Sequence, residues 1–325
     1  MGVIQLLAGK NATIYCQADN IILEMFRWQL CHGRISRQSI SRIKPGDLSA
    51  KPDQRYISVK TTVSSQQVKS YRENGFLLIR EFLDTQERKA LLKAVNSAVN
   101  IMGKSKVAGS NARGMVEGDS FYDNVFLQRL NLWKISPPIR EMFTDTSLGN
   151  MISELAGVPA MRIWHDQTLQ KMPWANPTAW HLDNPYWSFH SRDAISIWIA
   201  LDDVTVQNGC MYYLPGSHKR ATFDNALLNE NMSGLFDIYP EFQGIEPVAA
   251  EMKAGDVGFH NGLTAHAAGP NMTPRPRRAM TCAFMPDGAA FNGQPNILSD
   301  EYVASLRVGD LLQDDDQNPL VGTSI

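Results

Sequence analysis

The chain has 325 residues, of which 43% are hydrophobic and 20% charged, and its formal net charge is −2. These values are typical of a globular protein with a full core, and they exclude the basic footprint of a protein that binds nucleic acid or anionic membrane. No segment approaches the roughly 18–20 apolar residues of a membrane span. The four cysteines are far apart and form no CxxC pair: Cys16, Cys31, Cys210 and Cys282. This spacing favours a reducing compartment over a disulfide framework or zinc ribbon, so we expect a cytoplasmic protein.

The N-terminal part differs in character from the rest of the chain. Residues 1–62 are polar, basic and interrupted by Pro in their second half, so we predict an N-terminal extension there and a single catalytic domain over residues 63–325. Within that domain, the pattern from Ser64 predicts a helix that ends at Gly75. The apolar run over 76–83 then predicts a short strand.

The next segments predict further helices around a polar loop. Asp84 is an N-cap, and the apolar spacing that follows predicts an amphipathic helix to residue 102. Residues 103–125 are polar and rich in Gly and Ser, which is typical of a mobile loop, and with Arg113 this loop is a candidate lid. One or two more helices are expected over residues 137–157.

After residue 158 the pattern changes from helices to short strands. The candidate strands are rich in Ile, Trp, Tyr and Phe and are separated by Gly, Pro, Asn or Asp: 161–172, 178–187, 194–204, 210–218, 255–266 and 277–286. No repeat of fixed period is visible, which excludes a solenoid or a propeller. The sequence therefore predicts a mainly β protein, a sandwich or barrel with a helical N-terminal layer.

A candidate metal site lies in the segment TAWHLDNPYW. His181 and Asp183 are two residues apart, so on a strand their side chains would project to the same face. A facial triad needs a second imidazole and leaves three metal positions open. His266, 85 residues after His181, can supply it, and His260 is a competing candidate. An H-x-D pair alone is a weak signal, so this choice needs a second landmark.

Arg277 is that landmark. It begins a predicted strand on which Arg277, Ala279, Thr281 and Ala283 share one face. A guanidinium followed by small side chains suits an interior that leaves room for a bound molecule, and Arg grips carboxylates through two hydrogen bonds. The alternative is a solvated basic turn, which we expect for Arg275 and Arg278.

Three motifs resemble the phytanoyl-CoA dioxygenase family of iron(II)/2-oxoglutarate oxygenases. They are WHLDNPYW, then ISIWIALDDVTVQNGCMYYLPGSHK, then GDVGFHNGLTAHAAGPNMTPRPRRAM, in the family's order and at its spacings, and the tail LSDEYVASLRVGDLLQDDDQNPLV also matches. The resemblance runs from about residue 63 to the C-terminus. It implies a double-stranded β-helix, a cupin-like jelly roll, flanked by helices.

The resemblance also implies roles for individual residues. His181 and Asp183 match the family's H-x-D metal ligands, and His266, followed by a segment close to H-x-x-G-x-N, matches the distal histidine. Arg277, eleven residues after His266, matches the arginine that binds the C5 carboxylate of 2-oxoglutarate. By this comparison His260 lies near the site without binding the metal.

Two further residues are expected beside the cosubstrate. Trp198 corresponds to an aromatic position that lines the cosubstrate pocket in relatives, although a Trp in ISIWIAL would also fit a plain core. Gln167 lies on a neighbouring strand where relatives place a side chain near the cosubstrate. Because halogenating relatives lack the carboxylate ligand, the presence of Asp183 disfavours halogenation.

The expected activity is hydroxylation of a small metabolite or natural product, using Fe(II), 2-oxoglutarate and O2 and releasing succinate and CO2. Desaturation, cyclisation or peroxidation at the same iron is an alternative, as are a cupin-like metal protein of non-oxygenase chemistry and a non-catalytic binding module. The sequence does not identify the substrate. Aromatic residues near the H-x-D motif could line its pocket or belong to the core: Trp174, Trp180, Tyr186 and Trp187.

Overall fold

The computed structural model describes residues 62–108 and 121–322. Nearly all of the expected extension over 1–62, together with Arg113 in the candidate lid, lies outside the described residues. The domain boundary and the lid therefore stay predictions.

The first two described helices begin and end at the predicted residues. Helix α2 spans Ser65–Asn74 and ends at Gly75, whose φ of 83° is in the left-handed region. A β-carbon built at Gly75 would lie 2.4 Å from Thr264 Oγ1, so this tight turn also requires a residue without a side chain. Helix α3 spans Thr85–Met102, and the Asp84 carboxylate accepts hydrogen bonds from its first-turn backbone N–H groups.

The predicted helical segment over 137–157 forms two helices. Helix α4 spans Pro137–Phe143, with Pro in the first turn where no hydrogen bond is lost. Helix α5 spans Thr146–Ala156, starts at the N-cap Asp145 and ends at Gly157 in the left-handed region. Two short helices follow much later in the chain: α6 (Gly234–Ile238) and α7 (Asp300–Ser305).

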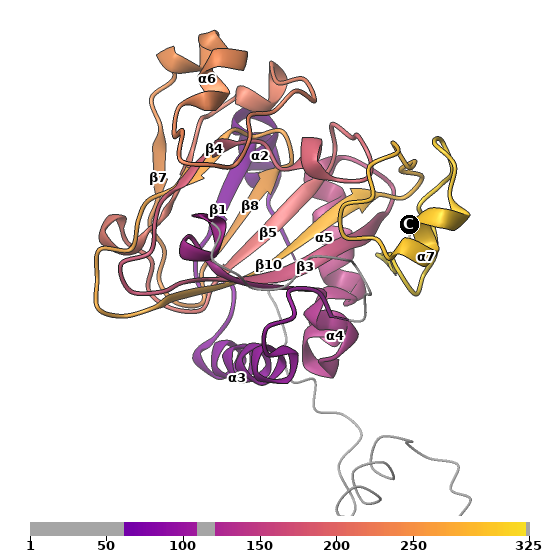
Figure 1. Cartoon of the computed structure of the whole chain (residues 1–325), viewed down its shortest axis with the longest axis horizontal. Coiled ribbons are helices and arrows are strands. Elements are labelled where there is room, and N and C mark those ends of the chain that lie inside the picture. Colours follow the sequence, from indigo (N-terminus) through magenta and orange to yellow (C-terminus); the bar gives the residue numbers. More distant parts are fainter. Residues whose placement is uncertain (1–61, 109–120, 323–325) are drawn as a thin grey trace, which may run out of the picture. The chain divides into compact units, whose positions relative to one another are not determined.

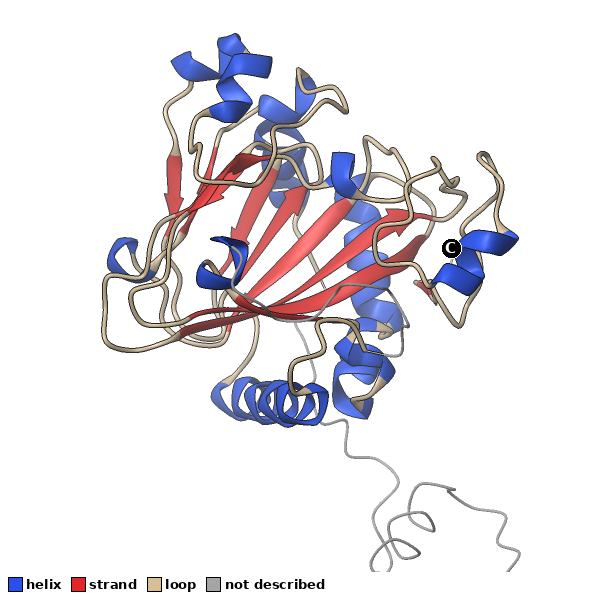
Figure 2. Ribbon diagram, viewed as in Figure 1, coloured by secondary structure: helices blue, strands red, loops and turns tan. Residues whose placement is uncertain are grey.

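Two antiparallel sheets contain the predicted strands (Figure 2), except that the single strand predicted over 255–266 is wrong: a turn divides it, and each sheet receives one part. The larger has the order β1-β8-β5-β10-β3-β11, and β2 also pairs with β3. Its strands are β1 (Phe76–Ile79), β2 (Leu127–Leu130), β3 (Met161–Lys171), β5 (Ile195–Ala200), β8 (Val257–Asn261), β10 (Arg277–Pro286) and β11 (Leu320–Val321). The smaller has the order β4-β9-β6-β7, with β4 (Thr178–His181), β6 (Met211–Tyr213), β7 (Val248–Ala250) and β9 (His266–Ala268).

The large sheet is buried on both faces. One face packs against helices α3, α4 and α5 (Figure 1), in a core that includes Leu91, Ile152, Ile197 and Phe284. The other face looks toward the small sheet. The predicted alternation along β10 is confirmed, since Met280, Cys282 and Phe284 join the helix-covered core while Ala279 and Ala283 belong to clusters on the opposite face. The fold is thus the expected double-stranded β-helix with flanking helices.

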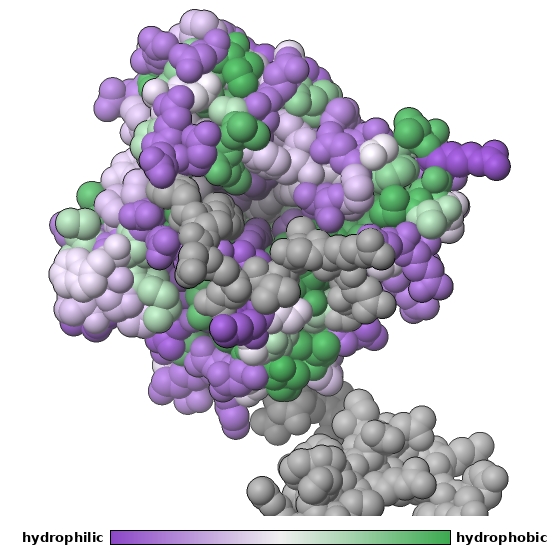
Figure 3. Space-filling view, viewed as in Figure 1, coloured by the Kyte–Doolittle hydropathy of each residue, from purple (hydrophilic) through white to green (hydrophobic). Residues whose placement is uncertain are grey.

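The described helices can be compared with the length and apolarity that a membrane span requires. On the face drawn in Figure 3, hydrophobic residues lie in small groups among hydrophilic ones. Within the part of the chain that the structure describes, no helix has the length and apolarity needed to cross a bilayer.

Candidate active site

Two histidines face each other across neighbouring strands of the small sheet. His181 ends β4 and is the direct cross-strand partner of His266 at the start of β9, and their ring centroids are 4.2 Å apart. Each ring is oriented through its Nδ1 atom, which lies 2.8 Å from the Ala179 carbonyl oxygen in His181 and 2.9 Å from that of Thr264 in His266. Because Nδ1 donates to these carbonyls, both Nε2 lone pairs are free to bind a metal.

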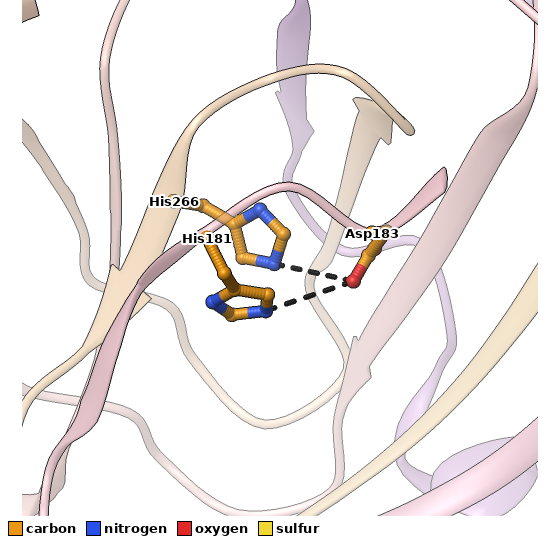
Figure 4. A group of neighbouring side chains, drawn as sticks. All are labelled: His181, Asp183 and His266. Carbon is orange, nitrogen blue, oxygen red and sulfur yellow. Dashed lines mark ion pairs between the residues drawn. The ribbon is translucent and has the colours of Figure 1, made fainter. Parts of the chain in front are cut away.

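Asp183 completes the group from a turn, which corrects the expectation that it shares a strand face with His181. Strand β4 ends at His181, and the backbone N–H groups of Asp183 and Asn184 both donate to the Gly262 carbonyl oxygen, at 3.0 and 2.9 Å. This anchor brings Asp183 Oδ1 within 3.7 Å of His181 Nε2 and 3.6 Å of His266 Nε2 (Figure 4).

The donor set fits a divalent metal. One ligand atom from each of His181, Asp183 and His266 lies within 4.8 Å of the other two. Burial lowers the pKa of His266 to about 3. Burial by itself would raise the pKa of Asp183, but the imidazoles of His266, His181 and His260 together hold it well below its usual value. A neutral imidazole and an ionised carboxylate are the forms that bind metal.

His260, the competing candidate, contacts the other oxygen of the carboxylate, and its ring centroid is 4.7 Å from that of His266. The Nε2 atom of His260 is 3.0 Å from Asp183 Oδ2, whereas Oδ1 is the oxygen that contacts His181 and His266. His260 is therefore hydrogen-bonded to a candidate ligand, and it does not belong to the group of three side chains whose ligand atoms lie close enough to hold one metal ion. The sequence motif gave the same order of preference between His260 and His266.

Arg277 is a fully buried cation whose guanidinium has no described hydrogen-bond partner. The first residue of β10 has no exposed surface, and none of its three guanidinium nitrogens has a hydrogen-bond partner among the described residues. Its guanidinium carbon lies 5.1 Å from the ring centroid of Trp198 and 5.8 Å from that of Phe126. Burial lowers its pKa to about 10, so it stays charged at neutral pH. Such a group fits a carboxylate that binds through two hydrogen bonds.

Trp198 and Gln167 lie on either side of Thr281, beside the candidate metal site. Thr281 on β10 pairs with Gln167 on β3 and with Trp198 on β5, so these three side chains form a row on the inner face of the large sheet. Gln167 Oε1 accepts a hydrogen bond of 2.6 Å from Gln128 Nε2. All three residues of the row line one pocket with His181, Asp183 and His266.

Lys171 is a second buried basic residue, and no sequence motif pointed to it. It is the cross-strand partner of Arg277, is fully buried, and donates from Nζ to the Asn176 carbonyl oxygen. Its Nζ also lies 4.5 Å from the ring centroid of Phe126. A lysine at the end of an alternating strand carries no sequence signal of burial, because only strand register places it against Arg277.

We expect Lys171 to make apo-protein stability depend on pH. Burial, reinforced by Arg277, lowers its pKa to about 6. Above about pH 6 the unfolded chain therefore binds a proton that the folded chain does not, and the free energy of unfolding rises with pH by up to about 1.4 kcal/mol per unit. Urea unfolding of the wild type and Lys171→Met between about pH 6 and pH 8 measures this slope. Equal slopes would mean that folded Lys171 keeps its proton.

Comparison with known proteins agrees with this geometry. A family model for phytanoyl-CoA dioxygenase (PhyH) matches residues 71–279, which is more than half of the chain. The chain belongs to the phytanoyl-CoA dioxygenase family. The resemblance drawn from the three sequence motifs is thereby confirmed.

Individual relatives cover most of the chain. Methylphosphonate hydroxylase of Gimesia maris is 26% identical over 251 residues, which are 77% of this chain and 88% of that protein. The carbocyclase SnoK of nogalamycin biosynthesis is 29% identical with a TM-score of 0.66, over 81% of this chain and 98% of SnoK. The epimerase SnoN, solved with Fe3+, alpha ketoglutarate and nogalamycin RO, is 26% identical with a TM-score of 0.64, over 78% of this chain and 97% of SnoN.

Family membership, the His-Asp-His group and these neighbours identify the chemistry. This family member is a non-haem iron enzyme that uses Fe(II), 2-oxoglutarate and O2, an oxidoreductase of the dioxygenase class. The alternatives of a non-oxygenase metal protein and of a non-catalytic binding module are set aside.

Proposed function

We propose that His181, Asp183 and His266 hold Fe(II) as a facial triad. The proposal is supported by the closeness of the three ligand atoms and by the two Nδ1 hydrogen bonds that aim the imidazoles. Bound iron supplies the reaction of O2 with a 2-oxo acid, which yields succinate, CO2 and an oxidised substrate. The chain's own part is to hold that metal on one side only, which leaves the side facing the pocket open.

Arg277 would hold the far carboxylate of 2-oxoglutarate. The single observation that carries this assignment is the buried guanidinium without a described hydrogen-bond partner. The rings of Trp198 and Phe126 cover the Arg277 guanidinium and shield it from water. Because the surroundings are then less polar, the guanidinium attracts an anion more strongly. Gln167 would lie along the cosubstrate, since it lines one pocket with the three candidate ligands and with Phe126 and Trp198, the two aromatic residues that contact Arg277.

The described pocket lining favours an uncharged, ring-bearing substrate. Apart from the three proposed ligands and His260, the side chains that line the pocket are uncharged, and Phe126, Tyr186, Trp187 and Leu228 are among them. A phosphonate would require a cation on the substrate side, whereas aromatic walls suit a ring. Two other aromatic residues lie elsewhere: Trp174 is 64% exposed, and Trp180 packs against Phe236.

We infer that the reaction is hydroxylation of a small, uncharged, ring-bearing natural product. Cyclisation and epimerisation are the alternative outcomes, because SnoK is a carbocyclase and SnoN an epimerase. The two free, buried thiols of Cys210 and Cys282 support the cytosol as the compartment of this reaction.

Substrate screening against the anaerobic Fe(II)/2-oxoglutarate complex tests the substrate class. We expect neutral polycyclic compounds to change the metal-to-ligand charge-transfer absorption of this complex. When O2 is then added, we expect one oxidised product molecule to form for each succinate released. A response to methylphosphonate but to no neutral ring compound would contradict the proposal.

A further inference from the structure

The two oxygens of the Asp183 carboxylate face different groups. Oδ1 points toward the Nε2 atoms of His181 and His266, at 3.7 and 3.6 Å. Oδ2 lies 3.0 Å from His260 Nε2 and 3.4 Å from the Ser196 hydroxyl. Hydrogen bonds therefore hold Oδ2, while Oδ1 is the oxygen that contacts the two imidazoles of His181 and His266.

The two side chains that contact Asp183 Oδ2 are held in place by the large sheet. Ser196 on β5 and His260 on β8 are direct cross-strand partners, so both side chains project from the same level of the sheet. His260 and Ser196 are each 3% exposed. Rigid strands at a packed interface hold such a pair more precisely than a loop would.

His260 has a defined donor atom. The Tyr213 hydroxyl lies 3.4 Å from His260 Nδ1, and Tyr213 is itself fully buried. When the hydroxyl donates to Nδ1, the imidazole hydrogen is on Nε2, where it meets Asp183 Oδ2. Tyr213, His260 and Asp183 thus form a short hydrogen-bonded chain that ends on Oδ2, while Oδ1 contacts His181 and His266.

The contacts of Oδ2 bear on whether the Asp183 carboxylate would bind a metal through one oxygen or through two. An aspartate binds a metal through one oxygen or two. A 2-oxo acid chelates through two positions and O2 needs a third, so a triad must contribute three positions and no more. We propose that His260 is a positioning residue that holds Asp183 Oδ2 away from the metal, so that Asp183 binds through Oδ1 alone. This inference rests on the ligand assignment proposed above.

His260→Met and His260→Gln test the inference as a matched pair. The two side chains have similar volume and flexibility, but only Gln offers an N–H donor in the place of Nε2. At saturating Co(II) under anaerobic conditions, we expect His260→Met to bind the metal and to bind 2-oxoglutarate at least about 10-fold more weakly than the wild type. We expect His260→Gln to restore that affinity to within about threefold, because it restores the bond to Oδ2.

The visible spectrum of the Co(II) protein provides a readout that does not depend on turnover. We expect the His260→Met spectrum, before cosubstrate is added, to differ from that of the wild type and of His260→Gln, since a second carboxylate oxygen changes the coordination. An unchanged 2-oxoglutarate affinity and spectrum in His260→Met would overturn the inference. Loss of Co(II) binding in His260→Met would also overturn it, because His260 would then act on the metal directly.

Two further variants keep the test decisive. Asp183→Ala should lose Co(II) binding itself, so failure of the ligand assignment is distinguished from failure of the role of His260. Should His260→Met not fold, Tyr213→Phe removes only the hydroxyl that orients the imidazole, and we expect it to weaken 2-oxoglutarate binding several-fold with Co(II) binding retained. Wild-type affinity in that variant would overturn the inference.

Discussion

Replacing Asp183 or His181 with Ala is expected to abolish the decarboxylation of 2-oxoglutarate. Each residue supplies one of the three ligand atoms that lie within 4.8 Å of one another, and no other His, Cys, Asp or Glu in the described residues completes such a group. A loss of at least about 10³-fold, equivalent to about 4 kcal/mol, is expected in kcat/KM. Succinate release without added substrate measures it.

A matched control separates loss of the metal from general damage. His190 is exposed and stacks on Phe223 with ring centroids 4.5 Å apart, away from the pocket lining. We expect His190→Ala to retain decarboxylation and Fe(II) binding. Full activity in Asp183→Ala or His181→Ala would contradict the ligand assignment.

Replacing Arg277 with Met is expected to have opposite effects on binding and on stability. The wild type buries a cation without a described hydrogen-bond partner, which costs folding free energy in the absence of an anion. Met should therefore keep or raise the melting temperature of the apo-protein. The same change removes the partner of the cosubstrate carboxylate, so the KM for 2-oxoglutarate should rise by about 100-fold or more.

The adjacent arginine is the control for this prediction. Arg278 points to the other side of β10 and binds Asp202 through two nitrogens, each at 2.7 Å. We expect Arg278→Met to leave the KM for 2-oxoglutarate within about twofold of the wild type, because its charge is already neutralised near the surface. If Arg277→Met left the KM unchanged as well, the carboxylate would have to bind elsewhere.

The sequence predicted the local parts of the fold because each depends on few residues. Ser64 and Asp84 fix helix starts through side-chain hydrogen bonds, and Gly75 and Gly157 fix helix ends through left-handed backbone. Strand alternation predicted which residues of β10 share a face, and the family resemblance predicted that the face of Arg277 is the inner one.

The rest depended on contacts between distant strands. Asp183 leaves the strand that carries His181, and it is the Gly262 carbonyl, about 80 residues away, that returns it to the site. The sequence predicted that His260 lies near the metal site. Its hydrogen bond to Asp183 Oδ2 could not be predicted, because it depends on the register between β5 and β8. Lys171 was missed for the same reason, since only pairing with β10 places it opposite Arg277.

Anaerobic titration of the wild-type protein with Fe(II) and 2-oxoglutarate tests the central claim most directly. The visible metal-to-ligand charge-transfer band should appear only when both are present, saturate at one Fe(II) per chain, be absent in Asp183→Ala, and require much more 2-oxoglutarate in Arg277→Met. A band of wild-type intensity in Asp183→Ala, or none in the wild type, would contradict an iron centre built from His181, Asp183 and His266.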